Sequence, residues 1–275
     1  MDLNTVAEVI SPAEVGQWRP GDAWLGGGTA LFAEPRPHLT RLLDLTTAGW
    51  PALTLDEHGL EIAATCTIAE LAASGYDIVE KCCHAFLASF KIWNVATVGG
   101  NLCAALPAGP MIALGSALDG TLKLLSPAGE TDSERTAGER TAGERTVPVA
   151  EFVTGEGTTV LRDGELVRSM RLPAASLSAR TAYRQGSLHA HGRSGVLVIG
   201  RVDSEQTLTL TVTAATKKPY VLRFPAEPDK ELVQIGLSER IPEDAYVDDV
   251  HGLPAWRRHL TRLYAEEIRA ELSAA

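Results

Sequence analysis

NVATVGGNLCAALPAG, residues 94–109, is the most informative stretch of this sequence. It places a hydroxyl at Thr97, two glycines at Gly99 and Gly100, and an amide at Asn101 among apolar neighbours. Residues without a Cβ let the backbone approach a bound anion closely. The stretch is too apolar for a linker, so we predict a buried functional loop that leads into a helix near Met111.

A second glycine-rich stretch, WLGGGTAL at residues 24–31, lies nearer the N-terminus. Such a run occurs in plain turns as well as in nests of N–H groups that bind anions. Neither stretch is a Walker A sequence, because no lysine follows the glycines, and neither has the GxGxxG pattern of a dinucleotide site. Two nests with few cations predict a buried diphosphate. The apolar residues that flank them suit the flat rings of a cofactor: Trp24, Leu25, Val98 and Leu102.

The composition is that of a globular protein with a negative charge. The chain has 275 residues, 45% of them hydrophobic, and a formal net charge of -10. This charge argues against a nucleic-acid partner, which would require clustered lysines and arginines. No stretch approaches the roughly 20 apolar residues that span a bilayer, and residues 1–12 lack the features of a secretory signal. The four cysteines show no CxxC spacing, so we expect a cytoplasmic protein with reduced thiols.

Short apolar segments separated by turns predict a mixture of strands and helices. Strands are expected at 24–28, 39–45, 60–64, 122–126, 147–152 and 165–172. Thr67 and Glu70 have the spacing of a capping box, which predicts a helix over 68–74, and a second helix is expected over 78–90. The repeat ERTAGERTAGERT at 134–146 has no apolar face and is expected to be a mobile hairpin loop without a chemical role.

Pro173 marks a predicted domain boundary, because the composition changes there to alanine and serine. Beyond it, strands at 195–199, 207–213 and 220–224 are expected to form a small antiparallel sheet. A terminal helix over 254–272 has an apolar face made of Trp256, Leu260, Leu263, Tyr264 and Ile268. Its basic residues suit either a partner-docking surface or a solvated face: Arg257, Arg258, Arg262 and Arg269.

Both glycine-rich stretches resemble motifs of the FAD-binding (medium) subunit of the xanthine dehydrogenase and carbon monoxide dehydrogenase family of molybdenum hydroxylases. WLGGGTAL is similar to the family's AGGT-D/E-L loop, and residues 94–109 are similar to its TIGGN loop. The likeness continues through 147–152, through GELVRSMRLP at 164–173 and through PAWRRHL at 254–260. It therefore extends over nearly the whole chain.

The resemblance implies an α+β fold of the vanillyl-alcohol-oxidase type, also called the PCMH-type FAD-binding fold. Residues 1–173 would form the FAD-binding domain, with two α+β subdomains at 1–55 and 56–173. Residues 174–275 would form a small α/β domain similar to the C-terminal domain of the carbon monoxide dehydrogenase flavoprotein. That domain would contain a three- to four-stranded antiparallel sheet and a terminal helix.

The resemblance also implies non-covalently bound FAD. Carried over by position, the residues that would hold it are Leu25, Gly26, Gly27, Gly28, Thr29, Ala30, Leu31, Thr97, Val98, Gly99, Gly100, Asn101 and Leu102. Leu166 and Val167 would pack near the flavin or the adenine. Arg184, in the stretch YRQGS, would lie near the flavin, where a positive charge stabilises the reduced ring.

Electron transfer is the function that the resemblance implies. A substrate would be hydroxylated at the molybdopterin of a large partner subunit, and electrons would pass through [2Fe–2S] clusters of a small iron–sulfur subunit to this FAD. The acceptor stays open among oxygen, NAD and a quinone-linked carrier. We expect no catalytic residue and no metal ligands in this chain, because no such constellation accompanies the glycines. Two alternatives are a stand-alone flavoenzyme of the enolpyruvyl-UDP-sugar reductase type and a degenerate, cofactor-poor structural subunit.

Three positions depart from the family's motifs. The acidic residue that follows the threonine of the first loop is Ala30 here. Leu106 and Pro110 replace the Ser and the Asp of the family's SP-x-x-D segment. Each lost hydrogen bond would cost about 1 kcal/mol of binding free energy, or roughly a factor of five in affinity. We therefore predict FAD binding that is weaker than in the family or altered in orientation.

Overall fold

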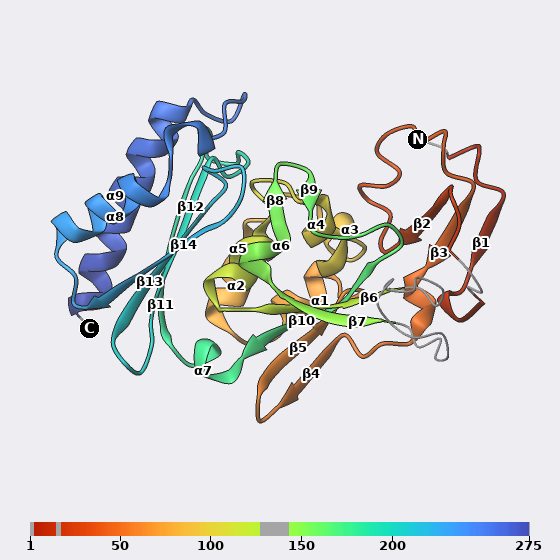
Figure 1. The fold of residues 1–275 in the computed structure, drawn as a ribbon, viewed down its shortest axis with the longest axis horizontal. Helices are drawn as coiled ribbons and strands as arrows, with labels where there is room; N and C mark the ends of the chain where they lie inside the picture. Colours follow the sequence, from red (N-terminus) through yellow and green to blue (C-terminus); the bar gives the residue numbers. More distant parts are fainter. Residues whose placement is uncertain (1–2, 15–17, 127–142, 275) are drawn as a thin grey trace, which may run out of the picture.

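The computed structural model describes residues 3–14, 18–126 and 143–274. Within these ranges, a three-stranded, a five-stranded and a four-stranded sheet follow one another along the long axis of the molecule (Figure 1). Helices fill the space between the five-stranded and the four-stranded sheet, and two further helices cover the C-terminal end. The predicted α+β fold is confirmed. None of the helices in the described ranges combines the length and the apolarity that a bilayer crossing requires.

The N-terminal sheet is parallel, with β3 (Arg41–Asp44) between β1 (Glu8–Ile10) and β2 (Asp22–Leu25). Arg41 Nη2 lies 2.6 Å from Asp22 Oδ2, and its Nε lies 2.8 Å from Asp22 Oδ1. Burial alone would raise the pKa of Asp22, but hydrogen bonds from Arg41 and from the Arg19 amide hold that pKa below its usual value. This bidentate pair joins the start of β2 to the start of β3, the two neighbouring strands of which β2 leads into the first glycine-rich loop.

The five-stranded sheet is antiparallel throughout. Its strands, in spatial order, are β4 (Leu53–Asp56), β5 (Gly59–Ala63), β10 (Leu166–Pro173), β6 (Thr121–Leu125) and β7 (Glu144–Pro148). Because β4 already pairs with β5, the two sheets divide before Leu53, whereas a subdomain boundary was expected at residue 55. A small hairpin of β8 (Val153–Gly155) and β9 (Thr158–Thr159) follows β7 along the chain.

The helical layer contains α1 (Ile68–Ala72), α2 (Asp77–His84), α3 (Phe90–Trp93), α4 (Val98–Ala104), α5 (Pro110–Ala117) and α6 (Val149–Phe152). The capping box predicted for α1 is present, with Glu70 N donating to Thr67 Oγ1 and Thr67 N donating to the Glu70 carboxylate. Every residue of α5 is buried, because this helix packs against β10 on one side and β13 on the other.

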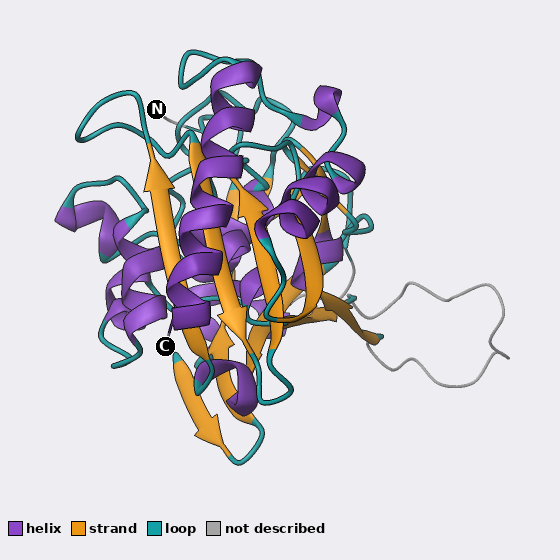
Figure 2. Cartoon of the chain, turned by 90° about the vertical axis from the view of Figure 1, so that its left-hand side faces the viewer, coloured by secondary structure: helices purple, strands orange, loops and turns teal. Residues whose placement is uncertain are grey.

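The C-terminal part begins with α7 (Ala174–Leu177) and forms a four-stranded antiparallel sheet. The strands are β11 (Arg180–Gly186), β12 (Val196–Val202), β13 (Thr207–Thr213) and β14 (Tyr220–Ala226), in that order. The helices α8 (Lys230–Arg240) and α9 (Pro254–Ala274) cover its outer face (Figure 2). All residues of β12 are buried, because α5 and α9 cover its two faces.

Arg257 has a structural role that the sequence did not indicate. It is 1% exposed, and its guanidinium donates to the carbonyls of Gly252, Gly195 and Ala214 and pairs with Asp249. The expectation that this arginine belongs to a docking or solvated surface is therefore wrong. Arg257 instead ties α9 to the ends of β12 and β13.

Two predicted elements differ from the observed ones, and one strand of the C-terminal sheet was not predicted. The helix expected over 78–90 ends at His84 as α2, because the chain turns there and Trp93 Nε1 donates to Phe86 O at 3.1 Å, and α3 begins only at Phe90. The strand expected over 147–152 ends at Pro148, which lacks an N–H for the ladder, and continues as α6. The strand β11 was not predicted.

The repeat at 134–146 lies mostly outside the described residues. Its last unit, Glu144 to Thr146, belongs to β7 and so is not part of a loop. Arg145 explains this difference, because its guanidinium lies 2.7 Å from the buried carboxylate of Glu165. An ion pair with a buried carboxylate can thus hold this repeat unit in a strand although the unit has no apolar side chain.

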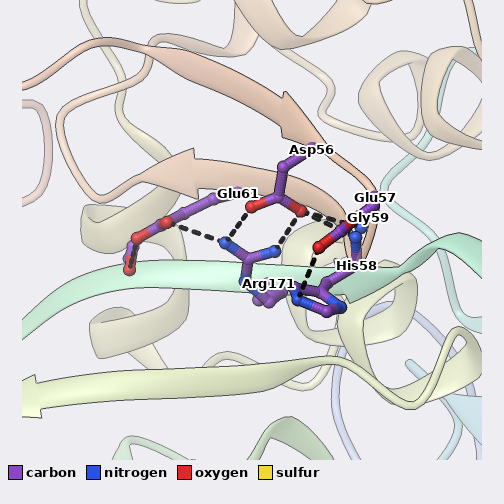
Figure 3. Close-up of polar contacts among 7 residues, drawn as sticks. Asp56, Glu57, His58, Gly59, Glu61 and Arg171 are labelled. Carbon is purple, nitrogen blue, oxygen red and sulfur yellow. Dashed lines mark hydrogen bonds and ion pairs between the residues drawn. The ribbon is translucent and has the colours of Figure 1, made fainter.

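A polar cluster links the first three strands of the five-stranded sheet (Figure 3). Arg171 of β10 donates to both carboxylate oxygens of Asp56 on β4, at 2.7 and 2.9 Å. The same guanidinium lies 3.1 Å from the Glu61 carboxylate on β5, which also accepts from Ser169 Oγ at 2.7 Å. The Asp56 carboxylate accepts two further hydrogen bonds, from the amides of His58 and Gly59.

We expect the replacement Arg171→Gln to raise the pKa of Asp56. Arg171, followed by the backbone amides, holds this pKa at about 2, against an ordinary value of 3.8. A depressed folded-state pKa means that the contribution to stability is present above about pH 4 and is lost as the pH falls toward 2. Carboxyl titration by NMR measures the shift, with the exposed Arg240→Gln as a control of equal charge change. An unchanged Asp56 pKa in the Arg171 variant would contradict the assignment.

Candidate cofactor-binding site

The first glycine-rich loop follows β2 and presents unpaired backbone donors. In the described part of the chain, the N–H groups from Gly27 through Leu31 donate no hydrogen bond to another protein group. The loop is closed by a turn in which Phe32 N donates to Gly28 O at 2.9 Å, and Gly28 has a φ of 72°. Successive unpaired N–H groups are the donors that an anion requires, so this loop fits the predicted nest.

The second stretch differs from the predicted loop and nest, because residues 98–104 form the helix α4 and the N–H groups at the start of that helix are already used. Val98 N donates to Cys66 O and Gly99 N donates to Ala64 O, both at 2.9 Å. Gly100 N donates to Thr97 Oγ1 at 3.1 Å, as the cap of α4. These bonds attach the loop to the end of β5. What this loop offers a ligand is therefore the Thr97 hydroxyl hydrogen and the side chain of Asn101.

Asn101 has one end of its amide committed and the other available. Its Oδ1 accepts from Met111 N at 3.1 Å and so holds the start of α5. Its Nδ2 donates no hydrogen bond within the described residues. The same side chain lines the larger of two cavities beside the loops, so it can donate to a ligand oxygen there.

The two loops are in direct backbone contact. A Cβ on Gly27 would lie 1.6 Å from Val95 O, and one on Gly26 would lie 2.8 Å from Thr97 Oγ1. Within the second loop, a Cβ on Gly99 would lie 2.6 Å from the Ala64 Cβ. A side chain at any of these positions would separate the loops or push α4 away from β5. These glycines are therefore required by packing, whether or not a ligand binds.

Two cavities adjoin at the contact between the loops. The larger, about 390 Å³, is bounded by the whole first loop and by Asn101, Leu106 and Phe86. The smaller, about 250 Å³, extends toward β10 and is lined by Leu161, Leu166 and Val167. Both are lined by Trp24, Gly26, Thr97, Gly100 and Cys103. The arrangement suits an elongated ligand whose polar middle lies between the loops and whose ends are flat and apolar.

Most of the predicted site residues are brought together around these cavities. Leu25, Val98 and Leu102 are exceptions and line neither cavity, and the latter two are fully buried in the core. Arg184 is also apart, since its guanidinium pairs with Glu267 and Glu271 of α9, each at 2.7 Å.

Two charged side chains that line the cavities were missed by the sequence analysis. Arg36 lines the larger cavity, and Glu165 lines the smaller one. Trp24, which was expected to suit the flat rings of a cofactor, lines both cavities, donates from Nε1 to Gly164 O at 2.9 Å and stacks on Trp18. No glycine or hydroxyl pattern marks Arg36 or Glu165, and only the folding of distant segments places them here.

Glu165 is fixed as an anion by its neighbours. Its carboxylate accepts from Arg145 Nε at 2.8 Å and from Arg162 N at 2.8 Å. The hydrogen bonds from Arg145, against the effect of burial, lower the pKa of Glu165. A carboxylate so engaged is a poor proton donor at neutral pH, which argues against general acid catalysis in the smaller cavity.

A family model described as "FAD binding domain in molybdopterin dehydrogenase" matches residues 4–175, which contain both loops and both cavities. The chain belongs to this family. No sequence among the curated proteins matches this member of the molybdopterin dehydrogenase FAD-binding family significantly.

Solved structures with the same fold are similar to this family member over nearly its whole length. A chain of reconstituted CO dehydrogenase from Oligotropha carboxidovorans has 19% identity and a TM-score of 0.78, and the match covers 100% of this chain and 99% of that one. A chain of quinoline 2-oxidoreductase from Pseudomonas putida 86 has 16% identity and a TM-score of 0.76, with 97% and 96% covered. Carbon monoxide dehydrogenase from Hydrogenophaga pseudoflava, lacking the Mo-pyranopterin moiety, has 19% identity and a TM-score of 0.76, with 98% of each chain covered. At such low identities, these likenesses establish the fold.

We expect Gly27→Ala and Gly100→Ala to differ clearly in their effects on stability. The Gly27 variant would place its Cβ against the Val95 carbonyl and should lose about 3 kcal/mol or more of unfolding free energy. Gly100 is exposed in α4, and a Cβ there would meet, among the described residues, only Thr97 Oγ1, at 3.0 Å. Alanine at this position should stay within about 1 kcal/mol of the wild type, since it also favours the helix. Denaturant unfolding measures both, and equal losses would contradict the packing described.

Proposed function

We propose that this chain is the FAD-binding, electron-transferring subunit of a multi-subunit molybdenum hydroxylase. The observation that supports this most is the run of unpaired N–H groups from Gly27 through Leu31. These groups lie beside the two adjoining cavities, within the part of this chain that matches the FAD-binding domain. The donors match a diphosphate, and the apolar lining on either side matches the ring systems of FAD.

The residues of the chain fit the cofactor in shape and in donor chemistry. The first loop and the Thr97 hydroxyl would hold the diphosphate, and Asn101 Nδ2 would donate to the same region. Because Gly100 has no Cβ, the region where the two cavities adjoin stays open for the ligand. Leu166 and Val167 would pack on one ring system. FAD bound here supplies the capacity to take up electrons from one partner and to pass them to another.

Substrate chemistry is proposed to lie on other subunits. The described side chains around the two cavities include one carboxylate, Glu165, which is held in its ion pair with Arg145. The sequence has no cysteine spacing for an iron–sulfur cluster. The proposed partners are therefore a large subunit with molybdopterin and a small subunit with [2Fe–2S] clusters, which would deliver electrons to this chain. The structurally similar CO dehydrogenase and quinoline 2-oxidoreductase support this assignment by analogy of fold.

An absorption spectrum of the purified chain, with and without added FAD, tests the proposal. We expect the bands of a bound flavin, and acid denaturation should release FAD, because no covalent link is proposed. Gly100→Leu should lower the affinity by a factor of about 10 or more, since its side chain would occupy the space between the cavities. The matched control is Ala255→Leu, which adds a leucine at an exposed position of α9. It should bind FAD as the wild type does.

Two results would overturn the proposal in different ways. A chain that takes up no FAD under any condition would instead be the cofactor-poor structural subunit. A chain that binds FAD and reduces an enolpyruvyl-UDP-sugar without any partner would instead be the stand-alone flavoenzyme. Co-purification with a molybdopterin subunit distinguishes the second result from the proposed electron-transfer role.

A further inference from the structure

Arg36 is a cation in the larger cavity that has no partner among the described residues. Its side chain is half-buried and lines the cavity together with the first glycine-rich loop. Its Nε is shielded from solvent and donates no hydrogen bond in the described structure. A buried, unpaired N–H of a guanidinium is costly, so an acceptor that entered the cavity would relieve this cost.

The charge of the cavity depends on this one residue. The other described side chains that line it are uncharged at neutral pH: Trp24, Thr29, Ala30, Leu31, Phe86, Ala96, Thr97, Asn101, Cys103, Ala104 and Leu106, besides the glycines. Ala30 stands where the family's motif has an acidic residue, so no carboxylate offsets Arg36 within this described lining. The lining therefore carries a single positive side chain.

Other arginines in this region are already engaged. Arg41 pairs with Asp22 at the start of β2, the strand that precedes the first loop, and Arg145 pairs with Glu165 beside the smaller cavity. Neither guanidinium lines the larger cavity. Arg36 is thus the side chain, within the described ranges, whose charge is available to an anion held by the first loop.

Two prolines and one backbone hydrogen bond restrict the backbone around Arg36. Pro35 and Pro37 flank it, and each restricts the chain through its fixed φ. Leu39 N donates to Arg36 O at 3.0 Å, and the Leu39 side chain is buried at the entry to β3. A cation on such a segment loses less conformational entropy on binding a ligand than one on a mobile loop.

We infer that Arg36 neutralises the diphosphate of the bound cofactor and makes the main charged contact with it. The inference rests on the proposed FAD site and adds a residue to it. The planar guanidinium offers several donors that match phosphate oxygens, while the first loop provides N–H groups from the backbone. This contact compensates for the hydrogen bonds that the family's acidic and hydroxyl residues would have made at Ala30 and Leu106.

The test compares the FAD dissociation constants of four proteins by flavin fluorescence, at low and at high salt. These are the wild type, Arg36→Gln, Arg36→Lys and the control Arg240→Gln, which removes an exposed charge from the end of α8. We expect Arg36→Gln to bind about tenfold to a hundredfold more weakly at low salt. Arg36→Lys should recover most of that loss, because it keeps the charge. The wild-type affinity should fall with salt more steeply than that of the Gln variant.

The outcomes separate this inference from the proposed function. A wild type that binds no FAD contradicts the proposed function itself. A wild type that binds FAD while Arg36→Gln binds equally well overturns only the role of Arg36. A loss in the Gln variant that Lys does not recover and that is equal at both salt concentrations also overturns it, because the side chain would then act through packing. Thermal unfolding of each variant verifies that the fold is retained. A wild-type affinity for FAD that does not change with salt concentration also contradicts the inference, without the need for any variant.

Discussion

The contact between Gly27 and the Val95 carbonyl determines the geometry of the candidate site. Backbone meets backbone there, and a Cβ on Gly27 would lie only 1.6 Å from the carbonyl oxygen. The contact joins the loop after β2 to the loop before α4, and so connects the N-terminal sheet to the five-stranded sheet. Because neither partner can change rotamer, the relative placement of the loops is fixed before a ligand arrives, and binding need not supply the cost of ordering them.

The two loops have different chemical roles despite their similar sequences. The second loop uses its N–H groups to attach α4 to β5, at Cys66 and Ala64, and offers only side-chain donors. The first loop keeps its N–H groups unpaired within the described structure. An anion would therefore be held mainly by the first loop, while the second forms the opposite wall. With Glu165 neutralised by Arg145, the cavities combine apolar surfaces with one small polar region, which is the distribution that a dinucleotide flavin presents.

The C-terminal part is attached to the rest of the chain through a shared helix. All of α5 is buried between the five-stranded sheet and the four-stranded sheet, so neither sheet can move without exposing apolar surface. Arg257 attaches α9 to the four-stranded sheet by donating to three backbone carbonyls near the ends of β12 and β13. Arg257 belongs to the WRRHL segment that supported the family resemblance, and its role in the described structure is to hold α9 against the sheet. Since Asn101 Oδ1 also holds the first turn of α5, the cavity and this central helix share one side chain.

Local sequence signals were sufficient for the parts of the protein that depend on neighbouring residues. The capping box at Thr67, the alternating strand at Thr207–Thr213 and the first glycine-rich loop follow from short patterns, because propensity, capping and the absence of a Cβ are local properties. The break between α2 and α3, the strand β11 and the burial of Arg257 were not predictable in this way. Arg184 was expected near the flavin but pairs with Glu267 and Glu271, whereas Arg36, which belongs to no motif in the sequence, lines the larger cavity. The partner of a charged side chain is decided by which distant segments pack together, and only the tertiary structure brings those segments into contact.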